Sequence, residues 1–365
     1  MKFVFHTSAS ASDGTPLEKR YLQAIDECVC AEEQGFDSIS FGEQHFNTDK
    51  ATQVSCPEMM SSAVASRTST IKLRWSSVVL LAFNHPIRVA ERIATLDLLS
   101  NGRAEISTAR SNHAPTMAAF QINPRETREQ WRESLDVIVA ALTQDPFQHS
   151  GKHWQIPPTK LVPHCIQKPH PPLFYASTSL EGLVTAGGLG LGALAGNSLP
   201  GGWDYVQQCS DAYHSAFDKA KPLSSVVNRS LATSIMTAHC AETMEKAFEE
   251  AGEASQKMLW MVINMFTELA KHAPSSDYAY MDNINAIRER VSDMAYVNDR
   301  SPYVSVGTPD FLIERFKKLE KMGYQEVILR IDQFSHDTVM RSLKMFGKYV
   351  IPEFRRSESL SAQTA

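Results

Sequence analysis

The chain has 365 residues, of which 43% are hydrophobic and 21% charged, with a formal net charge of -5 at pH 7. This composition is typical of a globular protein with a large core, and without a basic block it argues against nucleic acid or an anionic membrane as a partner. The first residues lack the pattern of a signal peptide, and no apolar run is long enough to span a membrane.

Strand and helix patterns alternate along the first half. The run Val78–Leu81 is apolar at consecutive positions, which is typical of a strand buried on both faces, and Pro86 suits the first turn of a helix. The predicted strand and helix pairs are residues 3–5 and 17–34, 38–41 and 57–67, 71–81 and 86–99, and 103–107 and 125–142.

The second half is less regular. Residues 145–172 are rich in proline and aromatic residues and indicate a surface excursion, such as a hairpin, and residues 258–305 indicate a helical insertion. The predicted strand and helix pairs are residues 173–176 and 180–187, 189–194 and 203–219, 230–238 and 242–256, and 325–331 and 338–349.

Eight strand-then-helix units predict a parallel (β/α)8 barrel, an α/β fold with right-handed crossovers. We expect residues 1–356 to form this single barrel with its insertions, and residues 357–365 to be a frayed polar tail. A doubly wound open sheet is the alternative arrangement of the same units.

Polar side chains follow six of the predicted strands. In a parallel barrel the active site lies at the carboxyl ends of the strands, so these positions are the first candidates for chemistry. They are His6 and Thr7 after the first strand, residues 42–46 with Gln44 and His45 after the second, residues 83–86 after the third, residues 108–113 with Arg110 and His113 after the fourth, Ser177, Thr178 and Ser179 after the fifth, and residues 196–198 after the sixth.

Arg110 and residues 177–179 form a candidate anion site. An arginine fork, serine hydroxyls and the free N–H groups of a following helix all bind phosphate. The serines serve equally well as a cap for that helix, and the sequence leaves both interpretations open. The histidines titrate near neutral pH and are candidates for proton transfer, although each also fits an ordinary hydrogen-bonded loop position.

Several other sites are excluded. The glycine-rich run 187–192 precedes a predicted strand, whereas a dinucleotide-binding motif follows a strand and opens a helix. No serine lies in a GxSxG turn. The six cysteines are scattered without metal-binding spacing, so we expect reduced thiols in the cytoplasm and no metal site.

Several segments occur together in an order and at a spacing that match one known family. They are residues 35–38 with 42–46, 77–91, 96–103, Arg110, Trp131, 151–154 and the proline-rich approach to the fifth strand. On these segments the chain resembles the bacterial luciferase-like monooxygenases, over about residues 1–200 and, weakly, over the last strand and helix.

The resemblance implies a flavin-dependent enzyme on a (β/α)8 barrel. Reduced FMN would react with O2 to give a flavin 4a-hydroperoxide, which inserts one oxygen atom into an apolar organic or biosynthetic substrate inside a water-poor pocket. A separate NAD(P)H:flavin reductase as a partner, and a homodimer, are also implied.

The resemblance assigns residues to the cofactor. Arg110 matches the family's phosphate arginine, and Ser177 and Ser179, with Thr178 between them, match its hydroxyl positions. The Ser77–Val78 bond falls where the family has a non-prolyl cis peptide under the flavin ring. Thr108 and Ala109 belong to the loop after the fourth strand, which is also expected to contact the cofactor.

Two departures from the family bear on catalysis. Gln44 stands where the luciferases have the catalytic first member of a histidine pair, and only His45 is kept; Ala109 replaces their reactive cysteine. Light emission is therefore not expected, and His6, His45 and His113 are the candidates for proton transfer. Two other functions stay open: deazaflavin-dependent hydride transfer on the same barrel, and a non-catalytic partner barrel.

Overall fold

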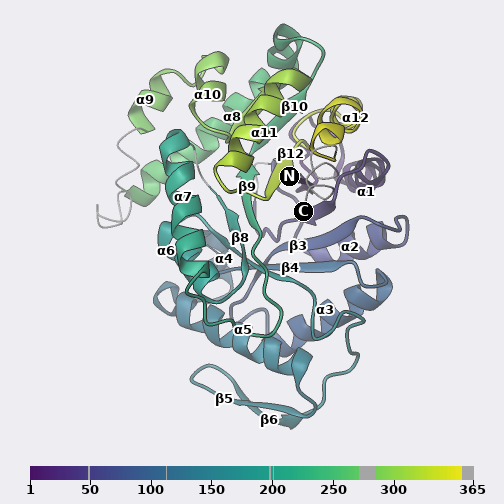
Figure 1. Cartoon of the computed structure of the whole chain (residues 1–365), viewed down its shortest axis with the longest axis vertical. Coiled ribbons are helices and arrows are strands. Elements are labelled where there is room, and N and C mark those ends of the chain that lie inside the picture. The colour runs from purple at the N-terminus through teal and green to yellow at the C-terminus, as the bar shows by residue number, and fades with distance from the viewer. Residues whose placement is uncertain (48–49, 112, 197–198, 200, 271–283, 356–365) are drawn as a thin grey trace, which may run out of the picture.

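Eight parallel strands close into a barrel, and helices cover its outside (Figure 1). The computed structural model describes residues 1–47, 50–111, 113–196, 199, 201–270 and 284–355. The ring order β1-β12-β9-β8-β7-β4-β3-β2 confirms the predicted (β/α)8 fold and excludes the open sheet. The barrel strands are β1 (Lys2–Thr7), β2 (Ser38–Phe41), β3 (Lys72–Val79), β4 (Ala104–Ala109), β7 (Leu173–Ser177), β8 (Gly192–Ala195), β9 (Leu231–Ile235) and β12 (Glu326–Arg330).

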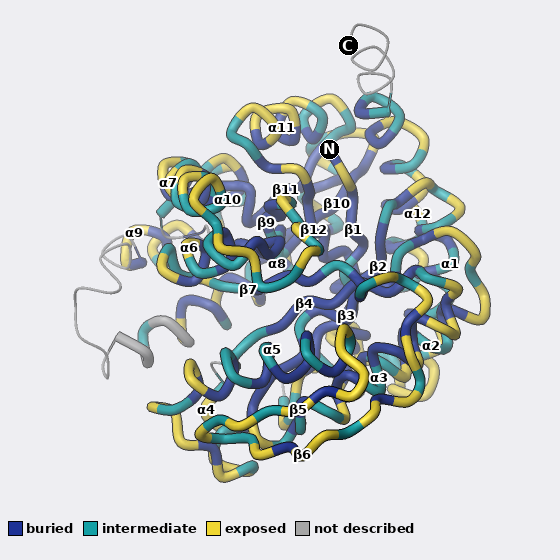
Figure 2. Tube along the Cα trace, turned by 60° about the horizontal axis from the view of Figure 1, so that its bottom comes forward, coloured by how far each residue is buried: buried dark blue, intermediate teal, exposed yellow. Residues whose placement is uncertain are grey.

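The helices turn buried faces to the barrel and exposed faces to solvent (Figure 2). They begin and end with the signals that the sequence supplies, such as a proline in the first turn of α2 and of α3. The helices are α1 (Leu17–Glu33), α2 (Pro57–Ala65), α3 (Pro86–Leu99), α4 (Ala114–Ala119), α5 (Thr127–Thr143), α6 (Leu180–Gly188), α7 (Gly202–Phe217), α8 (Met244–Ala270), α9 (Ile284–Glu289), α10 (Met294–Arg300), α11 (Pro309–Lys321) and α12 (His336–Met345), with a 3-10 turn at Pro124–Glu126 and a π-helical turn at Phe346–Val350.

The excursion predicted at 145–172 contains an antiparallel hairpin of β5 (Phe147–Ser150) and β6 (Gln155–Thr159). It lies at the edge of the molecule, next to α5 (Figure 1). The prediction of a hairpin is therefore confirmed.

Three segments of the second half differ from the prediction. The expected strand 230–238 is divided, because only β9 joins the barrel while β10 (Thr237–Cys240) pairs with β11 (Val304–Gly307) outside it. The expected helix 242–256 continues to Ala270, since residues 256–264 contain neither glycine nor proline to end it. The strand β11 and the helix α11 are absent from the prediction altogether.

Two predicted regions extend outside the described residues. The predicted helical insertion 258–305 does so in part, at residues 271–283, and the predicted tail 357–365 does so entirely.

The amino-terminal half of the barrel interior is filled by an ion cluster. Successive side chains of a strand point alternately inward and outward, and Arg74 of β3 reaches across to Glu105 at 2.7 and 2.9 Å and to Glu326 at 2.7 Å. Burial alone would lower the pKa of Arg74, but the two carboxylates raise it overall. An apolar layer that includes Phe174 and Ile328 adjoins this cluster. The cavity among the described residues lies toward the carboxyl ends of the strands.

Candidate functional site

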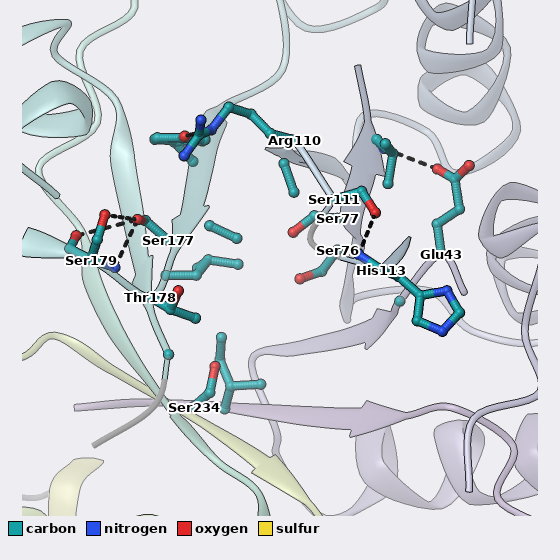
Figure 3. Close-up of a pocket in the computed structure, with 18 of the residues that line it drawn as sticks. Glu43, Ser76, Ser77, Arg110, Ser111, His113, Ser177, Thr178, Ser179 and Ser234 are labelled. Carbon is teal, nitrogen blue, oxygen red and sulfur yellow. Dashed lines mark hydrogen bonds between the residues drawn. The ribbon is translucent and has the colours of Figure 1, made fainter. Parts of the chain in front are cut away.

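A cavity of about 770 Å³ opens at the carboxyl ends of the barrel strands, a volume typical of sites for cofactors and small molecules. Side chains from both halves of the chain converge on it (Figure 3). Most of the residues predicted from the sequence line it. They are His6, Gln44, His45, Ser77, Ala109, Arg110, His113, Ser177, Thr178 and Ser179.

Val78 and Thr108 are the exceptions, and both are buried outside the cavity. The Thr108 hydroxyl donates to the backbone oxygen of Phe174 and accepts the indole N–H of Trp131. Their strand positions point away from the barrel interior, which explains why neither reaches the cavity. The non-prolyl cis bond joins Ser76 to Ser77, so its predicted position at Ser77–Val78 is wrong by one residue.

Arg110 lies half-buried just beyond the end of β4. Its Nε donates to the phenolic oxygen of Tyr175 at 2.9 Å, and the Tyr175 ring stacks on Trp131 with 4.0 Å between ring centroids. Among the residues that the structure describes, the two terminal nitrogens of Arg110 have no hydrogen-bond partner. The guanidinium is thus fixed at one atom and keeps its fork of donors for a ligand.

The serines after β7 shape the start of α6. The Ser179 hydroxyl accepts the N–H of Gly182 at 3.3 Å, and the Ser177 hydroxyl accepts the N–H of Ser179 at 3.1 Å. The capping interpretation is therefore confirmed. Leu180 and Glu181, the first two helical residues, also line the cavity, and within the described part of the chain their N–H groups have no partner. Anion binding at this helix start stays a prediction.

His45 is held by a buried carboxylate. Its Nε2 lies 3.0 Å from Oε1 of Glu43, and Glu43 also accepts the N–H of Val79 at 3.0 Å and the amide of Asn84 at 2.7 Å. The ring packs edge-on against Phe120 with 5.3 Å between centroids. The carboxylate fixes the orientation of the imidazole beside the cavity.

The pKa of His6 is strongly lowered. Its Nδ1 lies 2.8 Å from the hydroxyl of Ser40 and its Nε2 lies 3.2 Å from that of Ser8. Burial, and then the nearby charge of Arg330, lower the pKa of His6 to about 4, against the opposing effect of Asp332. His6 is therefore neutral at pH 7.

The other two predicted side chains stand at the rim. His113 Nδ1 lies 2.9 Å from the hydroxyl of Thr116 in α4. Gln44 is exposed, and its side-chain oxygen accepts the amide of Asn47 at 3.3 Å. Neither is enclosed by the cavity wall as His6 is.

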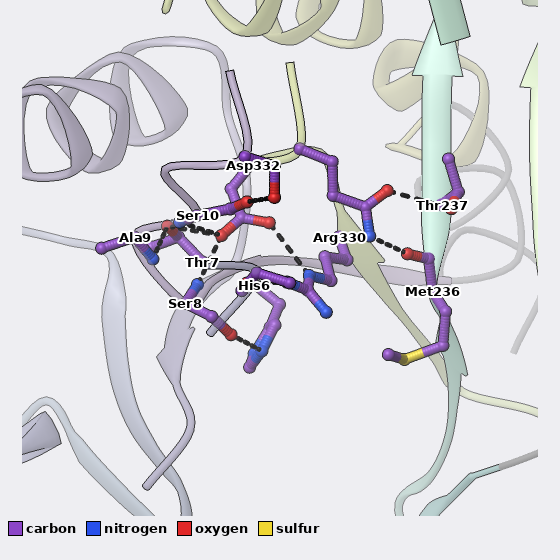
Figure 4. Close-up of polar contacts among 12 residues, drawn as sticks. His6, Thr7, Ser8, Ala9, Ser10, Met236, Thr237, Arg330 and Asp332 are labelled. Carbon is purple, nitrogen blue, oxygen red and sulfur yellow. Dashed lines mark hydrogen bonds and ion pairs between the residues drawn. The ribbon is translucent and has the colours of Figure 1, made fainter. Parts of the chain in front are cut away.

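Arg330, which lines the cavity, and its fully buried partner Asp332 were missed by the sequence analysis (Figure 4). Nε of Arg330 donates to Asp332 at 3.0 Å, and Asp332 also accepts the N–H groups of Ser8 at 2.6 Å and Ser10 at 3.2 Å. Burial opposes ionisation of Asp332, but Arg330 and then Arg20 bring its pKa below the ordinary value. Both residues lie at the carboxyl end of the predicted eighth strand, and this position is the sequence signal that indicates them.

A second missed pair lies at the rim near Arg110. Arg128 of α5 and Glu181 of α6 both line the cavity and form an ion pair, with exposed side-chain fractions of 60% and 63%. The residues lie in different helices and carry no motif, so no sequence pattern indicates their contact. The pair places one more cation and one more anion beside the candidate phosphate site.

The described ranges contain neither a metal-ligand cluster nor a helix that could span a membrane. No cluster of three or more metal-ligating side chains occurs among these residues. No helix that the structure describes has both the length and the apolar character to cross a membrane.

The fold and this mouth define the chain as a (β/α)8 barrel protein with a candidate site at the carboxyl ends of its strands. The model of the luciferase-like monooxygenase family matches residues 1–326, and the chain belongs to this family. The family resemblance and the enzyme class predicted from the sequence are thereby confirmed.

Characterised relatives match most of the chain. It is 25% identical over 357 residues to the oxygenase component of the flavin-dependent trigonelline monooxygenase of Acinetobacter baylyi, covering 95% of this chain and 93% of that protein. It is 25% identical over 329 residues to the 4-hydroxyprotoasukamycin monooxygenase of Streptomyces nodosus subsp. asukaensis, covering 88% and 84%. The match to the uncharacterized protein y4vJ of Sinorhizobium fredii, 32% identical, spans 45% of this chain and only about half of that protein, 46% of its length.

Solved structures share the fold. The oxygenating constituent of 3,6-diketocamphane monooxygenase from Pseudomonas putida, in complex with FMN, has a TM-score of 0.76 at 19% identity, covering 97% of this chain and 98% of that one. The coenzyme F420-dependent tetrahydromethanopterin reductase of Methanopyrus kandleri has a TM-score of 0.71 at 19% identity, covering 97% and 99%. At these identities the fold alone does not choose between the two cofactors.

Proposed function

We propose that this protein is a monooxygenase that uses reduced FMN and O2 to insert one oxygen atom into an apolar organic substrate. The observation that carries the proposal is the donor set at one end of the cavity. Arg110 offers two terminal nitrogens and α6 offers its first N–H groups, and none of these has a partner among the described residues. Relatives whose names state a flavin-dependent or FMNH2-dependent monooxygenase support the same cofactor.

The donor set fits a phosphate monoester. Arg110 would bind two phosphate oxygens with its fork, and Thr178, with the N–H groups of Leu180 and Glu181, would bind the third. Gly182 lets the loop stay tight, because a Cβ there would stand 1.9 Å from the Ser177 hydroxyl. Ser77 and Ala109 line the adjoining wall and would hold the flavin ring.

Reduced FMN, when bound, supplies the two electrons that activate O2. The side chains of this chain must then exclude water and handle one proton. Both ring nitrogens of His6 are engaged by hydroxyls, whereas His45 uses Nε2 on Glu43 and its Nδ1 has no hydrogen-bond partner among the described residues. We therefore assign the proton to His45, with Gln44 and His113 at the rim as weaker candidates.

The assignment of His45 is testable once product analysis has identified a substrate. His45→Ala should keep the affinity for reduced FMN within about twofold and lower oxygenation by about a hundredfold or more. Unchanged oxygenation would remove His45 from the chemistry.

Anaerobic titration tests the cofactor. The protein should bind reduced FMN at least about tenfold more tightly than reduced riboflavin, because riboflavin lacks the phosphate that the donor set binds. Oxygenation under 18O2 should place one labelled atom in the product. Tight binding of reduced F420 with none of FMN would establish the hydride-transfer alternative, and failure to bind either would favour the partner barrel.

The remaining proposals concern the partner protein, the cellular compartment and the oligomeric state. We propose a separate NAD(P)H:flavin reductase, supported by the relative named as an oxygenase component. We also propose a cytoplasmic homodimer. The described cysteines are free thiols, which suits a reducing compartment, and light scattering of the purified protein measures its oligomeric state.

A further inference from the structure

Arg330 places a second cationic donor in the cavity, on the side opposite Arg110. In the ring of strands, β12, which ends at Arg330, and β4, which precedes Arg110, are separated by three strands in either direction. The Arg330 side chain is 3% exposed, yet it lines the cavity. Its guanidinium end lies between the side chains of His6 and Met236, which also line the cavity (Figure 4).

The hydrogen bonds of Arg330 leave one nitrogen unused. Nε donates to Asp332 at 3.0 Å, and Nη2 donates to the backbone oxygen of Ala51. Nη1 has no partner in the part of the chain that the structure describes. Because the Arg330 side chain lines the cavity, a ligand there can supply the acceptor that this charged donor lacks within the described protein.

The charges around Arg330 favour a neutral acceptor over a negatively charged one. Arg330 and Asp332 cancel each other, and the neighbouring Arg20 is cancelled by a two-point pair with Glu27 at 2.7 Å. His6 is neutral because burial and Arg330 lower its pKa to about 4. A carboxylate would leave an uncompensated charge in this pocket, whereas a neutral oxygen would not.

We propose that Arg330 is a carbonyl-recognition residue. Its Nη1 binds a neutral C=O oxygen and so orients the molecule that carries this carbonyl group toward the cavity centre. Two molecules offer such an oxygen if the proposed function holds: a carbonyl-bearing substrate and the pyrimidine ring of the flavin itself. The residue narrows the substrate class of the proposed enzyme in the first case and aligns the cofactor in the second.

Matched small probes test the recognition without the natural substrate. Ligand-observed NMR titrations of the protein alone would use cyclohexanone, methylenecyclohexane and cyclohexanecarboxylate, which differ at one group. Cyclohexanone should bind at least about tenfold more tightly than methylenecyclohexane, and Arg330→Met should abolish the preference. Because this arm contains no flavin, its result stands even where FMN fails to bind.

A second arm locates the source of the oxygen. Reduced FMN is titrated anaerobically into the wild type and Arg330→Met. Unchanged FMN affinity with a lost ketone preference assigns the oxygen to the substrate. An affinity lowered at least about tenfold assigns it to the flavin. The proposal is overturned if both properties survive Arg330→Met within twofold, if the carboxylate binds tightest, or if no probe binds and FMN affinity is unchanged.

Two further variants guard against a folding defect. Arg330→Met leaves Asp332 without its cation, so the double variant Arg330→Met/Asp332→Asn removes both charges and should reproduce the same loss. Arg315→Met is the matched control, because Arg315 is a buried arginine in α11 that donates to Ser301 and Val304 away from the cavity. It should leave the ketone preference and the FMN affinity unchanged.

Discussion

The two sides of the cavity mouth use similar residues in opposite ways. On the β4 and β7 side, Arg110 donates from Nε to Tyr175, and its terminal donors have no partner within the described part of the chain. On the β1 and β12 side, Asp332 accepts from Arg330, from the Thr7 hydroxyl and from two backbone N–H groups, so its hydrogen-bonding capacity is largely used.

This difference indicates that the Asp332 network mainly stabilises the fold, whereas Arg110 mainly binds a ligand. The buried network around Asp332 holds the loop after β1 against β12, and breaking it should unfold the protein more readily. A half-buried arginine with free donors contributes little to folding and mainly serves a ligand. The comparison fails if mutation of Arg110 weakens folding or if mutation of Asp332 weakens only ligand binding.

The largest effect is expected at Asp332. Asp332→Ala leaves Arg330 as an unpaired buried charge and frees the N–H groups of Ser8 and Ser10, so the free energy of unfolding should fall by about 3–5 kcal/mol. Urea denaturation measures it. Asp218→Ala breaks an exposed pair with Arg229 and should change stability by less than about 1 kcal/mol. A comparably small loss at Asp332 would contradict the network.

His6 makes the same side sensitive to acid. Its pKa is about 4 in the folded protein, below the ordinary value of 6.5, so the unfolded chain binds the proton more readily. Stability should fall as pH drops from about 6.5 to about 4, by at most about 3 kcal/mol, and this contribution should be constant below that window. His6→Asn should flatten this part of the pH profile. An equally steep profile in the variant would rule out His6 as its cause.

The barrel itself could be predicted from the sequence. Val78–Leu81, the proline that begins α3 and the glycine after α1 mark elements whose local patterns agree with the fold. β10 and β11 could not be predicted, since each has only four residues and their pairing joins segments more than sixty residues apart. Short strands of this kind are specified by tertiary contacts, which no local pattern records.

The candidate site was predictable in part. Because the active site of a parallel barrel lies at the carboxyl ends of its strands, the sequence predicts that Arg110, the serines and the histidines share one cavity. The same rule predicts Arg330 at the end of β12. It could not show that Thr108 points outward, because the last positions of a strand differ in direction from one residue to the next. Nor could it show the contact between Arg128 and Glu181, which lie in separate helices.

Arg110 sharpens the comparison from the binding side. Arg110→Ala should weaken the binding of reduced FMN by about 1.5–3 kcal/mol, which lowers the affinity tenfold or more. The reason is that the charge-assisted hydrogen bonds from the guanidinium to the phosphate are lost. The free energy of unfolding should change by less than about 1 kcal/mol. Arg132→Ala, at an exposed position of α5 paired with Asp136, should alter neither property. Unchanged FMN affinity in Arg110→Ala would take this residue out of the phosphate site.

The smallest effect is expected at Ser179, where capping and anion binding use the same loop. Ser179→Ala removes the acceptor for the N–H of Gly182 and should lower stability by about 1 kcal/mol. Ser179→Asp separates the two roles, because aspartate caps a helix as well as serine does but adds a negative charge beside the phosphate. Its stability should match the wild type within about 0.5 kcal/mol, while its affinity for reduced FMN should fall several-fold. If FMN binding survives this charge unchanged in a folded variant, the serine loop is only a cap, and the open donors of Arg110 must serve a ligand that lies elsewhere in the mouth.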